Sequence, residues 1–208
     1  MTAEVVSPVA VGLGLGVALA SAPGPVQAVL LAEALRGGVA RGFRALAGAN
    51  VTFGLLLVCL ALGLSVAPPS GLTLRILKVA GGALLLWLAV EGFRSGHEVG
   101  RASGERRTIP PAARGALAVL LNPGAWLFLG VVASPIFASA TRLGGTGRAV
   151  FVAVALVIGL AIGDGAVVVL GGIGVRRAGE RVGWVVRRGL AAVLAGLGLW
   201  LLIGGVTA

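Results

Sequence analysis

Asp164 is the residue of this sequence whose position most clearly allows chemistry. It is the only aspartate of the chain, and it lies about halfway through an apolar stretch at 149–175. An ionisable group inside lipid is costly, so such a group commonly binds a proton, an ion or a substrate. A carboxyl there could exchange a proton for the ammonium group of a solute, because its charge depends on its surroundings. A structural hydrogen bond to a neighbouring helix is the alternative.

Two other apolar stretches are interrupted by proline and glycine. Because proline lacks a backbone donor and clashes with the preceding turn, both interruptions predict a broken helix. The restarting half-helix exposes unpaired N–H groups that can hold a carboxylate. Paired interruptions in two halves of a chain are typical of a transporter binding site, although simple kinks are the alternative. The predicted substrate-binding residues are Ser21, Pro23, Gly24, Pro25, Asn50, Asn122, Pro123 and Gly124, and Asp164 is the predicted proton or ammonium site.

Other polar residues near these breaks have more than one interpretation. Asn122 directly precedes Pro123, where its side chain could cap the following half-helix. Gln27 and Asn50 could line a polar path, or they could equally form hydrogen bonds between helices. Glu33 and Glu91 are each followed by an arginine three residues later, Arg36 and Arg94. This spacing predicts ion pairs on the surface of a helix.

The elements that carry these residues are long apolar blocks. Hydrophobic residues make up 58% of the chain and charged residues only 12%, against about 25% charged residues in soluble domains. A membrane-spanning helix needs about 20 apolar residues, and the alternation expected of barrel strands is absent. The sequence therefore predicts an all-α integral membrane protein with six transmembrane helices, the first and fourth broken, in the blocks 5–34, 43–66, 72–94, 113–140, 149–175 and 186–206.

The order of breaks and loops predicts two inverted three-helix repeats, at 1–94 and 113–208. They are joined by a cytoplasmic linker at 95–112, and three spans in each half require opposite orientations. Thirteen of the 17 Lys and Arg residues flank the first, third and fifth loops. This bias places those loops in the cytoplasm and both termini outside. No positive residue precedes the first apolar stretch, which favours a retained span over a cleaved signal peptide.

The composition also argues against several classes of function. The net charge of +10 comes from basic residues in short loops, so nucleic-acid binding is not expected. A single cysteine, Cys59, excludes an internal disulfide or a paired-thiol centre, and no cofactor or enzymatic site is predicted. A transporter of metal ions is the less favoured alternative, because metal sites need several carboxylates or His and Cys ligands. The abundance of arginine over lysine suggests a bacterial protein. A bacterial protein with these apolar blocks is expected in the plasma (inner) membrane, with lipids as partners. It could also form a homo-oligomer.

The chain resembles the lysine exporter (LysE/RhtB) family over nearly its whole length. The resemblance rests on the Pro-Gly-Pro motif at 23–25, the basic turn at 36–42, the segment at 77–88 and Asn122-Pro123-Gly124. It implies six helices and the export of small amino acids or related metabolites, coupled to proton movement.

One position departs from the family pattern. Members of the family often carry an acid about five residues after the glycine that matches Gly48, where this sequence has Phe53. A glycine followed five residues later by an acid occurs instead in the fifth block, at Gly159 and Asp164. Either the usual acid is lost, or its role has moved to the symmetry-related helix.

Overall fold

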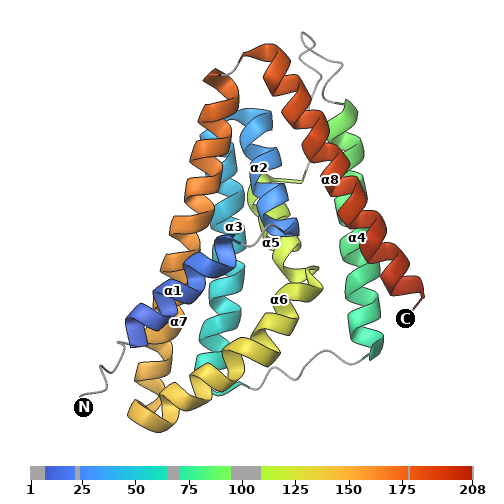
Figure 1. The fold of residues 1–208 in the computed structure, drawn as a ribbon. Helices are drawn as coiled ribbons and strands as arrows, with labels where there is room; N and C mark the ends of the chain where they lie inside the picture. The colour runs from blue at the N-terminus through green and yellow to red at the C-terminus, as the bar shows by residue number, and fades with distance from the viewer. Residues whose placement is uncertain (1–7, 22–23, 65–70, 95–108, 178, 208) are drawn as a thin grey trace, which may run out of the picture.

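The computed structural model describes residues 8–21, 24–64, 71–94, 109–177 and 179–207, all of them helical or in short connections. Figure 1 shows long helices side by side. The elements are α1 (Pro8–Ser21), α2 (Pro25–Gly37), α3 (Val39–Ala61), α4 (Gly71–Arg94), α5 (Pro111–Leu120), α6 (Pro123–Leu127), the π-helical η1 (Phe128–Ala133), α7 (Ser134–Arg177) and α8 (Glu180–Val206).

The first predicted break separates α1 from α2. The axes of the two helices are bent by 68°. Gly24 is extended, with φ −160° and ψ −178°, and Pro25 is the first residue of α2, where its missing N–H and fixed φ suit the start of a helix. The predicted break in the first apolar block is therefore confirmed, while Pro23 lies outside the described residues.

The second predicted break separates α5 from α6. The Asn122 side chain accepts a hydrogen bond from the backbone N–H of Gly124 at 3.0 Å, so Asn122 caps the half-helix that begins at Pro123. On the other side of the break, the Trp126 indole N–H donates to the carbonyl of Leu120 at 2.8 Å. This bond satisfies one of the carbonyls that a helix end leaves unpaired. The predicted cap is confirmed.

The long element α7 contains a turn at Gly144 and Gly145. Both residues have non-helical backbone angles, and Gly145 has φ 73°, a conformation that favours glycine. Figure 1 shows the chain reversing its direction between the yellow helix and the orange one. This turn lies in the loop predicted between the fourth and fifth apolar blocks.

Four helices of the described residues are long and apolar enough to cross a membrane, or five if the bent pair α1–α2 counts as one span. The longest of these stretches, Pro123–Gly174, contains an 18-residue window with a mean hydropathy of 2.5 and includes the turn at Gly144 and Gly145. The prediction of an all-helical membrane protein is confirmed at this level.

Glycine allows two pairs of helices to approach backbone to backbone. Where α1 crosses α7, a Cβ on Gly16 would collide with the backbone of Leu156, and one on Gly159 would collide with Leu13. The same occurs where α5 crosses α3, because a Cβ on Gly48 would collide with the backbone of Ala112. Each initial half-helix is thus in close contact with a long helix of the other half of the chain.

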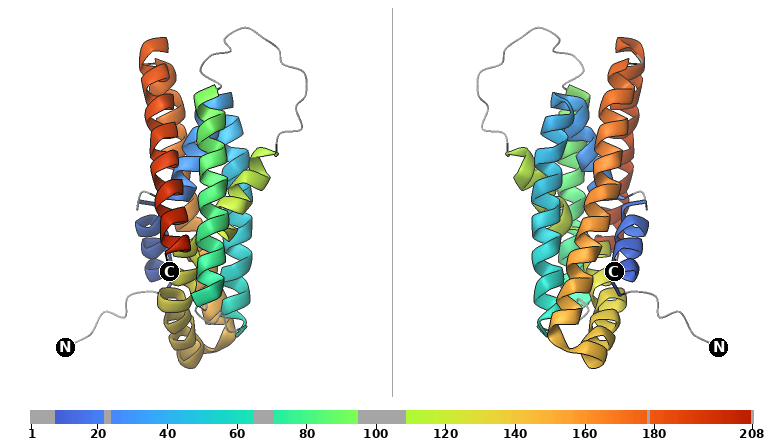
Figure 2. Two further views of the ribbon diagram at one scale, coloured as in Figure 1. Left: turned by 90° about the vertical axis from the view of Figure 1, so that its right-hand side faces the viewer. Right: turned by 90° about the vertical axis from the view of Figure 1, so that its left-hand side faces the viewer.

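A third glycine contact joins α4 to α8, and it is reciprocal. A Cβ on Gly82 would lie 2.7 Å from the carbonyl oxygen of Gly198, and one on Gly198 would lie 2.9 Å from that of Gly82. Real Cβ atoms almost never come this close to another atom. The views in Figure 2 show the molecule elongated along these helices.

The helix ends form two groups at the two ends of the molecule. The ends of α2, α4 and α7 and the starts of α3 and α8 lie at one end, which we name the arginine-rich end for Arg36, Arg41 and Arg177 on these segments. The turn at Gly144 and Gly145 lies at the opposite end, and the start of α1 and the end of α8 point toward it (Figure 1). The basic helix ends that the sequence predicts on one side are therefore gathered at one end of the fold.

Candidate functional site

A cavity of about 240 Å³ lies where the two helix breaks meet. Its lining comes from α1, α2, α3, α5, α6, η1 and α7. Ligand pockets for drug-sized molecules usually occupy about 300–1,000 Å³, so this cavity suits a smaller solute.

Six of the nine predicted site residues line this cavity: Gly24, Pro25, Asn50, Asn122, Gly124 and Asp164. Pro123 is buried beside the cavity at the start of α6. The side chain of Ser21 is exposed, and its hydroxyl donates to the carbonyl of Val17 at 2.8 Å. Residues from both halves of the sequence thus line one cavity.

Asp164 is the one ionisable residue among the described residues that line the cavity, and it is only 1% exposed. The Gln27 side-chain amide donates to its Oδ1 at 3.4 Å, which is long for a hydrogen bond. A buried carboxylate is stabilised only when it is paired or fully hydrogen-bonded. One long bond from a neutral amide leaves Asp164 able to accept a proton or a cation.

Asn50 contributes a buried acceptor to the cavity lining, from α3. Its Oδ1 has no hydrogen-bond partner within the described part of the chain. Buried polar atoms are nearly always paired, so an unpaired one needs an explanation such as a bound molecule. Asn50 is therefore placed to accept a hydrogen bond from whatever fills the cavity.

The start of α2 supplies hydrogen-bond donors. Gly24 occupies the N-cap position, and within the described residues no side chain forms a cap hydrogen bond at this helix start. The N–H groups of Val26 and Gln27, in the first turn, have no partner within the helix by their position, and both residues line the cavity. A helix start carries partial positive charge, so this wall of the cavity favours an anionic group.

Two aromatic side chains are part of the remaining wall. The rings of Phe53 and Phe128 are 5.9 Å apart, with a tilt of 40°. Phe53 follows Gly48 by five residues, just as Asp164 follows Gly159, and each of these glycines contacts the backbone of an initial half-helix. Phe53 and Asp164 thus each follow a backbone-contacting glycine at the same spacing, and both line the cavity.

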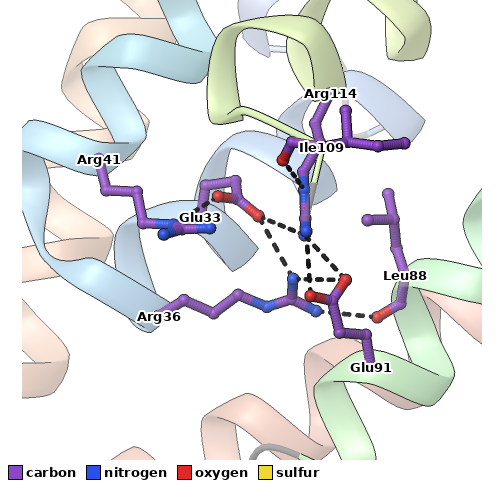
Figure 3. Close-up of polar contacts among 7 residues, drawn as sticks. All are labelled: Glu33, Arg36, Arg41, Leu88, Glu91, Ile109 and Arg114. Carbon is purple, nitrogen blue, oxygen red and sulfur yellow. Dashed lines mark hydrogen bonds and ion pairs between the residues drawn. The ribbon is translucent and has the colours of Figure 1, made fainter. Parts of the chain in front are cut away.

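A buried network of charges lies toward the arginine-rich end, drawn in Figure 3. At its centre is Arg114 on α5, whose side chain is fully buried. Its guanidinium donates to Glu33 at 3.0 Å and to both carboxylate oxygens of Glu91 at 2.9 and 3.0 Å. Its Nε donates to the carbonyl of Ile109 at 2.9 Å, and its charge lies 5.1 Å from the centre of the Trp87 ring.

Two further arginines complete this network. Arg41 donates through Nε to Glu33 at 2.7 Å. Arg36 lies 3.0 Å from Glu91 and 3.4 Å from Glu33. The network therefore joins α2, α3, α4 and α5, and it links the two halves of the chain.

The predicted surface ion pairs of Glu33 and Glu91 need correction. The pair of Glu33 with Arg36 exists, but the Glu33 side chain is only 1% exposed. Glu91 is 26% exposed and pairs with Arg36 and Arg114, while the side chain of Arg94 lies outside the described residues. Local spacing could not reveal Arg114, because it lies 81 residues from Glu33 and only the tertiary fold brings the two together.

No group of three or more His, Cys, Asp or Glu residues within the described ranges could hold a metal ion. The groups that line the cavity are complementary to the two charges of a small zwitterion. Its one acid matches an ammonium group, and the uncapped start of α2 matches a carboxylate.

One of three comparisons with known proteins found a match. Neither the curated proteins nor the solved structures contain a match to the chain. The family model described as LysE type translocator matches residues 17–205, which include both helix breaks, the cavity and the charge network. The chain therefore belongs to the LysE type translocator family, whose members are membrane exporters of small solutes and not enzymes.

Proposed function

We propose that this translocator is a secondary exporter of small amino acids or related metabolites, driven by proton movement. The observation that carries the proposal is the cavity at the two helix breaks, which holds one buried acid, Asp164, and the uncapped start of α2. A zwitterionic amino acid offers both of the complementary charges. The bacterial plasma (inner) membrane is the proposed location.

The proposal includes six membrane crossings in two inverted repeats. A continuous helix over the 52 residues of Pro123–Gly174 would be about 78 Å long, against about 30 Å of hydrocarbon. The turn at Gly144 and Gly145 divides this stretch into 123–143 and 146–174, each long enough to span. Together with α1–α2, α3, α4 and α8, these two segments give six crossings.

The glycine contacts support the inverted repeat. If α1 corresponds to α5, α3 to the second segment of α7, and α4 to α8, then the contact of α1 with α7 corresponds to that of α5 with α3. In the same correspondence, the reciprocal contact of Gly82 with Gly198 joins equivalent positions of α4 and α8. With the arginine-rich end in the cytoplasm, both termini are outside.

In the proposed binding mode, the substrate carboxylate lies against the backbone at Gly24 and the first turn of α2. The substrate ammonium lies against Asp164. When the ammonium leaves, a proton neutralises Asp164, because an unpaired carboxylate is costly in this buried place. Since ammonium and proton compete for one carboxylate, outward movement of substrate is coupled to inward movement of a proton.

Access from the arginine-rich end must pass the level of the charge network. Glu33 follows Gly24 by nine residues, Arg114 precedes Asn122 by eight, and Arg41 precedes Asn50 by nine. At 1.5 Å per residue, the network lies about 12–14 Å from the cavity along three of its helices. The proposal therefore requires the network to separate when the cytoplasmic side opens.

The test is transport by Asp164→Asn in proteoliposomes. The variant keeps the shape of the side chain and removes its charge, so uptake of amino acids against their gradient, driven by an imposed pH gradient, should be lost. Asn122→Asp, which adds a carboxyl group elsewhere in the cavity lining, serves as the charge control. Proton-driven transport at the wild-type rate by Asp164→Asn would remove Asp164 from the mechanism.

A further inference from the structure

The distribution of charge in the cavity points to a narrower class of substrate. We propose that the cavity selects amino acids with an apolar side chain and excludes those with a second positive charge, and that Phe53 is a determinant of this choice. This inference rests on the proposed function and concerns the same site.

Asp164 is the one ionisable group among the described residues of the lining, and the α-ammonium of an amino acid already pairs with it. A second ammonium would enter the cavity without a carboxylate. Removing an unpaired ion from water costs several kcal/mol after relaxation, which weakens binding on the order of 1,000-fold.

The other walls of the cavity offer an apolar surface to a substrate side chain. Phe53 is buried at 4% exposure, and the remaining apolar lining includes Phe128, Val119 and Leu160. Each methylene group that these walls remove from water improves binding by about fourfold. An apolar side chain of increasing length is therefore favoured until the cavity of about 240 Å³ is full.

The aromatic rings provide the strongest counter-argument, because a cation can bind to the face of a ring. Phe53 and Phe128 could each present such a face. This contact recovers about 30-fold in affinity, which does not offset a loss on the order of 1,000-fold. The balance still favours the apolar side chain by about 30-fold.

Phe53 is the position at which this selectivity could be reversed. It is the counterpart of Asp164 in the other half of the chain and faces the same cavity. An acid at this position would give the cavity two carboxylates, one for each positive charge of a diamino acid. The phenylalanine thus replaces a second anionic site with an apolar surface.

The test compares two solutes that differ in one group: lysine and 2-aminoheptanoate, in which a methyl replaces the ε-ammonium. Equilibrium exchange of each solute across proteoliposomes is measured by isotope label, so no driving gradient is needed. For the wild type, half-saturation should require about 30-fold more lysine. Equal or better exchange of lysine would overturn the inference and leave the proposed function standing. Exchange of neither solute, nor of alanine, would overturn the proposed function and the inference with it.

Two variants test the role of Phe53. Phe53→Asp should raise the exchange of lysine relative to 2-aminoheptanoate by tenfold or more. Because a buried acid can prevent folding, Phe53→Ala is the second variant, and it should reduce the preference for 2-aminoheptanoate over alanine. The control is Phe137→Ala, since Phe137 is equally buried but outside the cavity lining. If Phe53→Ala and Phe137→Ala retain the same preference, Phe53 is not a determinant.

Discussion

Replacing Arg114 by methionine should destabilise the protein more than any other single loss of charge at the arginine-rich end. Arg114 is fully buried and holds two carboxylates that belong to α2 and α4. Methionine fills most of the volume but leaves those carboxylates without their central partner. Breaking a buried pair from one side commonly costs about 3–5 kcal/mol.

The remaining partners set the magnitude within that range. Glu33 keeps Arg41 at 2.7 Å, and Glu91 keeps Arg36 at 3.0 Å. We therefore expect about 3 kcal/mol, at the lower end, which corresponds to a loss of about 6–12 °C in Tm for a chain of this length. Arg114→Lys should recover only part of this loss, because a lysine cannot bond to both oxygens of Glu91 as a guanidinium does.

The assay is thermal unfolding of the purified protein in detergent, followed by a double-mutant cycle. Arg75→Met is the matched control, since the Arg75 guanidinium makes an exposed bond to the carbonyl of Val206 at the far end of the fold and should change Tm little. Combining Arg114→Met with Glu91→Gln should cost clearly less than the sum of the single changes. A Tm within 2 °C of the wild type for Arg114→Met, or strictly additive effects in the cycle, would refute the role given to this network.

Three further predictions concern packing, capping and orientation. Gly48→Ala should prevent the close contact of α3 with α5 and lower the yield of folded protein, whereas Gly14→Ala, with nothing within 4 Å of the new methyl, should not; size-exclusion profiles compare the two. Asn122→Ala should cost about 1 kcal/mol through loss of the cap to Gly124, measured as a fall in Tm, and an unchanged Tm would contradict the role of this cap. A reporter fused after Ala208 should be active only outside the cytoplasm; a cytoplasmic signal would reverse the proposed orientation.

The features that the sequence predicted correctly are those that depend on neighbouring residues. Pro25 and Pro123 begin half-helices because of their own covalent geometry, and Asn122 caps one of them from the adjacent position. The turn at Gly144 and Gly145 follows from the conformational freedom of glycine. None of these features requires knowledge of which helices pack together.

The features that the sequence could not reveal depend on contacts between distant segments. Ser21 was predicted in the site because it adjoins the Pro-Gly break, but its helical phase turns it to an exposed surface, where it bonds to Val17. Arg114 flanks the third, basic loop in the sequence, yet the fold buries it between Glu33 and Glu91. Phe53 lies in the cavity lining because α3 packs against α7. No local sequence pattern encodes this contact between the two helices.

The backbone contacts at glycine have a consequence for how the molecule can move. Because Gly16 and Gly159 bring α1 against α7 with no side chain between them, α1 cannot slide or rotate on α7 without a steric collision. The same holds for α5 on α3, through Gly48 and Ala112. We therefore expect the protein to move as mixed pairs, each made of a half-helix from one half of the chain and a long helix from the other. The two helix breaks at the walls of the cavity are then the places where we expect hinge motion.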